Sequence, residues 1–131
     1  MLSSLIPPAT EMNRQLLKEI SEQFARGNME FVAPHLADGV RWNVLGEETI
    51  VGREQVLEVS KMLQLQSFPR ITIKNVVSEG DFVVVESTGE ATTNNGKPYN
   101  QSYCEVFRFA DGELREITTY LDTALSREAL S

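Results

Sequence analysis

The sequence contains very few of the side chains that form disulfides or bind metals. Its 131 residues include one cysteine, Cys104, and one histidine, His35. A single cysteine cannot form an internal disulfide, and one histidine with one cysteine does not give the ligand spacing of a zinc or iron site. We therefore expect no metal and no cofactor. The lone thiol also fits a reducing compartment, and we expect the protein to be cytoplasmic.

Basic residues are scarce compared with acidic ones. The chain has 12 Lys and Arg against 19 Asp and Glu, a formal charge of −7. Nucleic acids and anionic membranes are bound by basic surfaces, so we expect neither as a partner. The first apolar run is broken by Pro7 and Pro8 and has no basic residue before it. We interpret residues 1–9 as an N-terminal arm, not as a signal peptide or a membrane span.

Motifs for phosphate binding and nucleophilic catalysis are missing as well. The sequence has no glycine-rich phosphate loop, no nucleophile elbow and no Ser-His-Asp order that suggests a triad. Acid–base chemistry on a small molecule, or ligand binding without chemistry, is what remains.

The hydrophobic patterns of the sequence predict helices mainly in its first half and strands mainly in its second half. Apolar residues at helical spacing predict helices over 11–26, 29–36 and 53–65. A short strand is predicted over 40–44, and period-two patterns predict strands over 70–78, 82–93, 98–109 and 114–122. We predict one α+β domain in which three helices cover one face of a curved antiparallel sheet, with a tail helix over 123–131. Its core is predicted to contain Leu17, Ile20, Phe24, Val56, Leu63, Val84 and Phe107.

The dipeptide Asn95-Gly96 predicts how two strands pair. If it forms a two-residue hairpin turn, the numbers of paired residues sum to 191. Glu86 then lies opposite Glu105, on the same face as Tyr103. Two facing carboxylates are unfavourable unless they share a proton, which is one way to prepare an acid or a base. The alternative is a different register.

The same register predicts an apolar set on the face away from the helices. A small domain has nothing left to cover that face, so we expect a homodimer packed sheet to sheet, with Arg108 within the interface or at its rim. Cys104 is expected there as an inert, buried or interface thiol. The predicted interface contains Val83, Val85, Cys104 and Val106.

Two segments carry a family resemblance, "DGVRWNVLGEETIVGREQVLEVSKML" and "VVVESTGEATTNNGKPYNQSYCEVFRFADGELREITTYLDT". Together they resemble the SnoaL-like branch of the nuclear transport factor 2-like superfamily, which also includes ketosteroid isomerase, limonene epoxide hydrolase and scytalone dehydratase. The resemblance implies a cystatin-like α+β roll, a cone around an apolar pocket, usually in a dimer. A shared fold does not fix the reaction.

The resemblance implies functional positions one at a time. Ketosteroid isomerases carry a carboxylic acid four residues before the Phe of an Arg-Phe pair, and that position is Glu105 here. Their catalytic Asp falls on or near Asn43, and their oxyanion Tyr falls near Ile20, so both of those groups are lost. In polyketide cyclases of the SnoaL type a late Asp acts as acid or base, and Asp122 is the nearest match.

Two functions follow as hypotheses. In the first, the protein moves protons on a small hydrophobic carbonyl or cyclic metabolite, as an isomerase, cyclase, dehydratase or hydrolase. Glu105 is then the acid or oxyanion donor and Glu86 or Asp122 the base, while Tyr103 and Asn43 orient the ligand. In the second, the protein is a non-catalytic binding or scaffold dimer with solvated acids. The other candidate ligand-binding residues are His35, Trp42, Phe107 and Tyr120.

Each polar candidate also has a purely structural interpretation. Glu105 could be bridged to Arg108 or Lys97, or it could be exposed on a less curved sheet. Asp122 directly precedes the tail helix, where Asp is a favoured N-cap. Tyr103 and Tyr120 could be core residues with satisfied hydroxyls, and Trp42 could pack in the core. His35 could be an ordinary helix-end residue instead of a proton carrier.

Overall fold

The computed structural model describes residues 8–62, 66 and 69–131. The predicted arm therefore lies outside the described residues up to position 7, and so do the predicted helix end over 63–65 and the core position Leu63. The elements are α1 (Pro8–Ala25), α2 (Met29–Val32), the 3-10 helix η2 (Ala33–His35), β1 (Leu36–Val44), β2 (Thr49–Val51), α3 (Arg53–Met62), β3 (Arg70–Glu79), β4 (Phe82–Thr92), β5 (Pro98–Ala110), β6 (Glu113–Leu121) and α4 (Thr123–Leu130).

The predicted elements are confirmed within a few residues, and local chemistry explains their ends. Helix α1 ends at a left-handed Gly27, with φ of 76°. The amide of Asn28 donates to the carbonyl of Gln23 over 2.9 Å, which closes the last turn. The side chain of Asn28 then accepts from the amide of Phe31 and starts α2. Strand β1 begins four residues earlier than predicted, and β2 was predicted as a connection.

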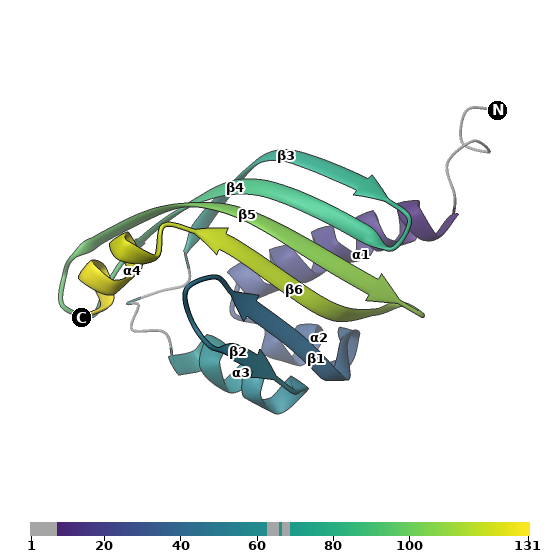
Figure 1. Cartoon of the computed structure of the whole chain (residues 1–131), viewed down its shortest axis with the longest axis horizontal. Coiled ribbons are helices and arrows are strands. Elements are labelled where there is room, and N and C mark those ends of the chain that lie inside the picture. The colour runs from purple at the N-terminus through teal and green to yellow at the C-terminus, as the bar shows by residue number, and fades with distance from the viewer. Residues whose placement is uncertain (1–7, 63–65, 67–68) are drawn as a thin grey trace.

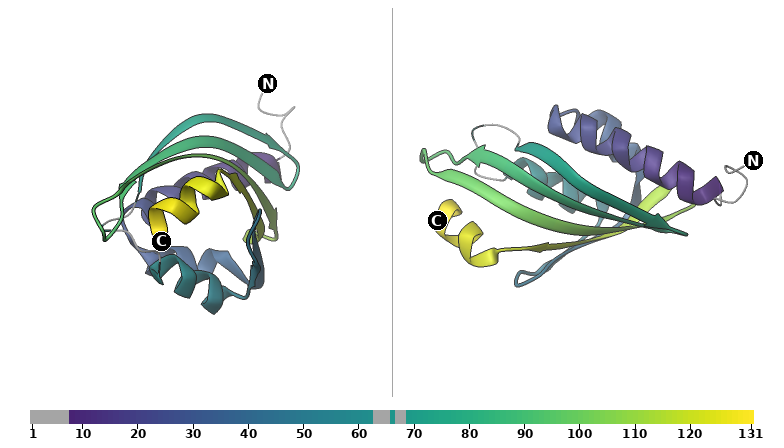
Figure 2. Two further views of the ribbon diagram at one scale, coloured as in Figure 1. Left: turned by 60° about the vertical axis from the view of Figure 1, so that its left-hand side comes forward. Right: turned by 90° about the horizontal axis from the view of Figure 1, so that it is seen from above.

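The described strands form one six-stranded sheet in the order β2-β1-β6-β5-β4-β3. Strand β1 pairs with β6 in parallel, so the sheet is mixed and not entirely antiparallel as predicted. The sheet is strongly curved, with α1 running along its concave side (Figure 1). The sheet curls over the top and one side, α2 and α3 lie below, and α4 lies toward the near end (Figure 2, left). The predicted fold class is therefore confirmed.

The core lies between the concave face and the helices. Leu17, Ile20, Val56 and Phe107 are buried there as predicted, and Phe24 packs against them partly buried. Val84 was also predicted in the core, but it is only partly buried and points to the outer face. The buried cluster contains Leu17, Ile20, Val32, Leu36, Val40, Val56, Val83, Val85, Phe107, Phe109 and Leu114.

The predicted register of β4 and β5 is wrong by one residue. The numbers of paired residues sum to 190, as in the pair of Val85 with Glu105. Within the described 93–97 loop, positive φ is confined to Gly96. A two-residue type I′ turn needs positive φ at both central positions, so the chain forms a three-residue loop closed by Thr93 and Lys97, with the Thr93 amide donating to the Lys97 carbonyl over 2.9 Å.

A slip of one residue exchanges the two faces of a strand. Val83 and Val85, predicted on the dimer face, are 0% and 8% exposed in the core. Glu86 is instead exposed on the outer face. Cys104, predicted to be buried or in an interface, is exposed on the outer face of the described chain.

Candidate functional site

Glu105 lies near the middle of β5 on the concave face, between Val85 of β4 and Thr119 of β6. Both neighbours are buried, and Thr119 is 3% exposed. Glu105 itself keeps part of its surface accessible. Burial raises the pKa of its carboxyl, and the hydrogen bond from Thr119 offsets part of that rise. The acid thus sits in the interior wall of the fold, as the sequence predicted.

A short hydrogen-bond relay fixes the orientation of this carboxyl. The indole Nε1 of Trp42 donates to Oγ1 of Thr119 over 2.9 Å, and that hydroxyl donates to Oε2 of Glu105 over 2.7 Å. An indole N–H can only donate, so Thr119 uses a lone pair for Trp42 and its single proton for Glu105. Oε2 is therefore an acceptor. A proton held by the carboxyl resides on Oε1, which has no hydrogen-bond partner among the described residues.

A β-bulge in β6 brings Thr119 to this position. Arg108 pairs with Glu116 and Phe109 with Leu114, so Arg115 is an extra residue in the strand. Without the bulge, the Asp111-Gly112 turn would place Thr118 opposite Glu105. The relay therefore depends on an irregularity that the alternation of side chains does not reveal.

Tyr103 shares the concave face with Glu105, two positions earlier in β5. Part of its surface is accessible, as for Glu105. Burial, the adjacent Tyr99 and the charge of Glu105 all raise the pKa of its phenol, burial most. Phe107, two positions after Glu105, is 9% exposed and belongs to the core. The structure thus brings Trp42, Tyr103, Glu105 and Phe107 to one face.

The proposed partner acid Glu86 does not face Glu105. It lies on the outer face, where its Oε1 accepts from Nδ2 of Asn75 over 2.7 Å. Asn43 also lies on that face, donating from Nδ2 to Glu116 over 3.0 Å and to Thr118 over 3.2 Å. Tyr120 is 46% exposed there. The one-residue error in the β4–β5 register explains why Glu86 was predicted on the wrong face. The bulge in β6 explains why alternation counted from the Asp111-Gly112 turn assigns the later residues of that strand to the wrong face.

Asp122 and His35 take the structural roles that the sequence left open. Asp122 is the N-cap of α4, and its Oδ1 accepts from the amide of Leu125 over 3.1 Å. His35 ends η2 and packs against the ring of Phe31, with centroids 5.0 Å apart. Among the described residues, neither side chain forms a hydrogen bond, an ion pair or a ring contact with Glu105.

Sequence reasoning missed the buried polar residues Thr119 and Gln101. The side-chain Nε2 of Gln101 donates to the backbone carbonyl of Asp122 over 2.9 Å. Its Oε1 accepts from the backbone amide of Asp122 over 3.2 Å. This clamp fixes the start of α4 against β5. One sequence signal could have found Gln101, because it alternates with Tyr103 and Glu105 along one strand. No such signal indicated Thr119, because the bulge changes the face of the sheet on which its side chain lies.

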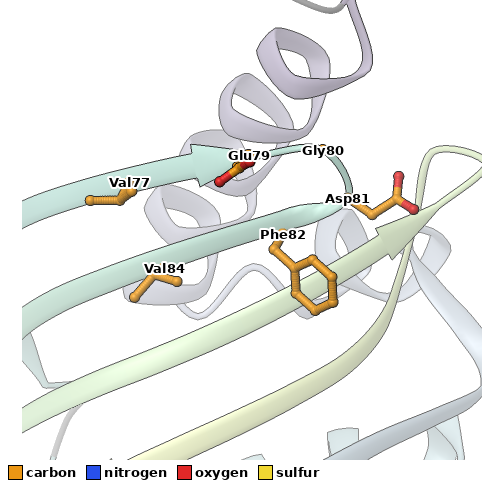
Figure 3. Close-up of a pocket in the computed structure, with 6 residues that line it drawn as sticks. All are labelled: Val77, Glu79, Gly80, Asp81, Phe82 and Val84. Carbon is orange, nitrogen blue, oxygen red and sulfur yellow. The ribbon is translucent and has the colours of Figure 1, made fainter.

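The described residues offer neither a metal centre nor a membrane span. No group of three His, Cys, Asp or Glu side chains in this part of the chain could hold a metal ion. No described helix is long and apolar enough to cross a membrane. A shallow groove lies on the outer face near the β3–β4 turn, on the side of the sheet away from α1 (Figure 3). It is lined by Val77, Glu79, Gly80, Asp81, Phe82 and Val84.

Comparison with solved structures shows the fold to be widespread. A candidate SnoaL-like polyketide cyclase from Jannaschia sp. CCS1 is 19% identical, with 95% of this chain and 94% of that chain covered and a TM-score of 0.85. An LEH-like epoxide hydrolase from M. tuberculosis is 18% identical, with 94% and 92% covered and a TM-score of 0.80. A de novo designed protein with a curved β-sheet is 25% identical, with 91% and 92% covered and a TM-score of 0.71.

These likenesses establish the architecture and leave the chemistry open, because enzymes and a designed protein share it. No curated protein sequence matches the chain. The family model of the SnoaL-like domain matches residues 17–117, well over half of the sequence. The chain therefore belongs to the SnoaL-like domain family.

Proposed function

We propose that this protein binds a small, largely hydrophobic, neutral metabolite on the concave side of the sheet, with Glu105 as the hydrogen-bond donor to a ligand oxygen. One observation carries the proposal: Glu105 is a partly accessible acid among buried neighbours, with one oxygen occupied by Thr119 and the other unpartnered among the described residues. The raised pKa of the carboxyl favours the neutral acid, which donates from Oε1.

The chemistry that this arrangement supports is polarisation of a carbonyl or a related oxygen. A neutral acid aimed at an oxygen stabilises negative charge that develops there, as an oxyanion donor does. The same group can deliver its proton as a general acid. Reactions of the isomerase, cyclase, dehydratase or epoxide hydrolase type use such a donor, and the names of the structural neighbours make these classes the first to assay.

The alternative, a non-catalytic binding module, is favoured by a different observation. The expected base, Glu86 or Asp122, does not join Glu105, and neither does Asn43, which was expected to orient the ligand. Glu86 and Asn43 bond on the outer face, and Asp122 caps α4. Proton abstraction from a ligand would then require Glu105 to act alone, or a group brought by the ligand itself. Binding without turnover would leave the donor role of Glu105 unchanged.

A ketone probe tests the donor role. The protein is titrated with 2-acetylnaphthalene over a range of pH, and binding is followed by calorimetry and by the indole N–H resonance of Trp42. Affinity should fall as pH rises through the raised pKa of Glu105, because a carboxylate repels the carbonyl oxygen. Glu105→Gln keeps a neutral donor and should bind with little pH dependence, whereas the matched control Glu86→Gln should behave like the wild type. Shifts confined to the outer face, with an unmoved Trp42 resonance, would contradict the proposal.

We also propose that the outer face of the sheet forms a homodimer interface, with a different residue set from the one predicted. Val77 and Phe82 are 63% and 48% exposed there, beside the partly buried Val84 and Val106. These side chains line or adjoin the groove in Figure 3. Sedimentation at micromolar concentration should show a dimer that the double substitution Val77→Asp and Phe82→Asp dissociates. A wild-type protein that sediments only as a monomer overturns the proposal.

The location of the protein remains a proposal as well. Cys104 is exposed and unpaired in the described chain. Such a thiol persists in a reducing compartment, which supports the cytoplasm. Alkylation of Cys104 by a membrane-permeable maleimide in intact cells, compared with an impermeable one, tests this.

A further inference from the structure

We infer that the ligand is held at two polar points, Glu105 and the phenol of Tyr103, so that the site selects a neutral molecule with a second oxygen at the end away from Glu105. The inference rests on the proposed function, because it assumes a ligand on the concave side. It adds a second contact and a shape to that ligand.

The placement of Tyr103 is the first step. Gly89 of β4 pairs with Gln101, two positions before Tyr103. A Cβ on Gly89 would lie 2.9 Å from Cε2 of Tyr103 and 3.5 Å from its hydroxyl oxygen, so the ring lies directly over this glycine. The ring therefore leans along β5 away from Glu105. Successive same-face residues of a strand are about 7 Å apart, and the phenol and the carboxyl are separated by at least about that distance.

Hydrogen bonding of the phenol is the second step. Tyr103 lies near Tyr99, which contributes to its raised pKa, and the hydroxyl of Tyr99 lies 2.8 Å from Oγ of Ser126 on α4. Nε2 of Gln101 donates to the same Ser126 oxygen over 3.2 Å. A hydroxyl has one proton and two lone pairs, so Tyr103 keeps hydrogen-bonding capacity for a ligand even with Tyr99 nearby. The hydroxyl of this positioned, partly accessible side chain can thus take a ligand oxygen.

The charge of the wall is the third step. In the described strands β4, β5 and β6, none of the concave-face positions that alternate with Glu105 carries a basic side chain. An anionic group would be desolvated there without a counter-ion, at a cost of several kcal/mol as an order of magnitude. The raised pKa of Tyr103 keeps its phenol neutral at neutral pH. The site therefore suits a keto-alcohol or diol type of ligand and rejects carboxylates and phosphates.

Three naphthalene probes test the inference by calorimetry. 6-Acetyl-2-naphthol differs from 2-acetylnaphthalene by one hydroxyl at the far end, and 6-acetyl-2-naphthoate carries a carboxylate there. One net hydrogen bond should make the hydroxyketone bind roughly 2- to 12-fold more tightly than the plain ketone. The carboxylate should bind more weakly than the plain ketone. Tyr103→Phe should abolish the preference for the hydroxyketone and leave the affinity for the plain ketone within about twofold.

Tyr120→Phe is the matched control, because Tyr120 lies on the outer face. It should keep the full preference. Ser126→Ala loosens Tyr99 and should reduce the preference partly, without changing binding of the plain ketone. If both ketones bind equally, or Tyr103→Phe keeps the preference, the second contact is wrong and the proposed function stands. If neither ketone binds, the proposed function fails together with this inference.

Discussion

Acidic side chains have different environments on the outer and concave faces of the sheet. On the outer face, Glu86 bonds to Asn75 and Arg108 pairs with Glu116 over 3.5 Å, all partly or fully in solvent. On the concave face, Glu105 bonds to the hydroxyl of Thr119, with no ion pair in the described chain. An exposed pair contributes about 0–1 kcal/mol and has little chemical consequence. For the carboxyl of Glu105 in the interior wall, burial raises the pKa instead.

The contrast teaches that residue type alone does not make a functional acid. Glu86 and Glu105 lie on adjacent strands, and a register shift of one residue would bring Glu86 to the concave face, opposite Glu105. Burial raises the pKa of Glu105, and the relay from Trp42 determines which oxygen can hold the proton. The environment thus provides the chemistry. Substitutions matched across the two faces can break or sharpen this comparison.

The largest expected difference is between two phenylalanines. Phe109 is fully buried on the concave face, whereas Phe82 is 48% exposed on the outer face. Phe109→Ala should lower the free energy of unfolding by about 3–5 kcal/mol, because it leaves a cavity. Phe82→Ala should cost under about 1 kcal/mol. Urea titration of both variants measures this, and equal losses at dilute, monomeric concentration would show that the outer face is also core.

Two glycines give the next comparison. A Cβ on Gly89 would meet the Tyr103 ring at 2.9 Å and Ile71 at 3.2 Å, while one on Gly39 would meet nothing within 4 Å. Gly89→Ala should therefore destabilise the protein by about 1–3 kcal/mol through overpacking. Gly39→Ala is the control and should be neutral or slightly stabilising. Thermal unfolding compares them, and a neutral Gly89→Ala would mean that Tyr103 has room to move.

Adjacent threonines on opposite faces come third. Thr119→Val removes the hydroxyl that joins Trp42 to Glu105 and leaves buried polar groups unpaired, so we expect a loss of about 1–3 kcal/mol. The pKa of Glu105 should rise further, because the bond from Thr119 lowers it. Thr118→Val removes one bond near solvent and should cost less than about 1 kcal/mol. A side-chain carboxyl titration by NMR in both variants decides whether the relay acts on Glu105.

The smallest expected effect on stability at neutral pH is that of neutralising Glu105. A carboxyl whose pKa is higher in the folded than in the unfolded state binds more protons when folded, so wild-type stability should fall as pH rises from about 4.3 through the folded pKa. Glu105→Gln should remove that fall and be as stable as, or more stable than, the wild type at pH 7. Glu86→Gln should change stability by less than about 0.5 kcal/mol. A wild-type curve that rises over this range would mean that Glu105 is stabilised as a carboxylate.

Much of the molecule follows from the sequence by itself. Helical and period-two spacing predicted the order and approximate bounds of most elements, because these patterns are properties of local backbone geometry. The same rule placed Tyr103, Glu105 and Phe107 on one face, since neighbours within a strand alternate whatever its partners do. The Asp111-Gly112 turn was predicted correctly, because both residues adopt the positive φ that a type I′ turn needs.

Only the tertiary structure decided how the strands meet. The three-residue loop at Asn95-Gly96 and the bulge at Arg115 each shift a pairing by one residue, and so exclude Glu86 from the site and bring Thr119 into it. The parallel pairing of β1 with β6 depends on distant segments in the same way. Pairing between strands is set by packing between residues far apart in the chain, such as the 2.8 Å bond from the Phe109 amide to the Asp81 carbonyl, and local patterns do not contain that information.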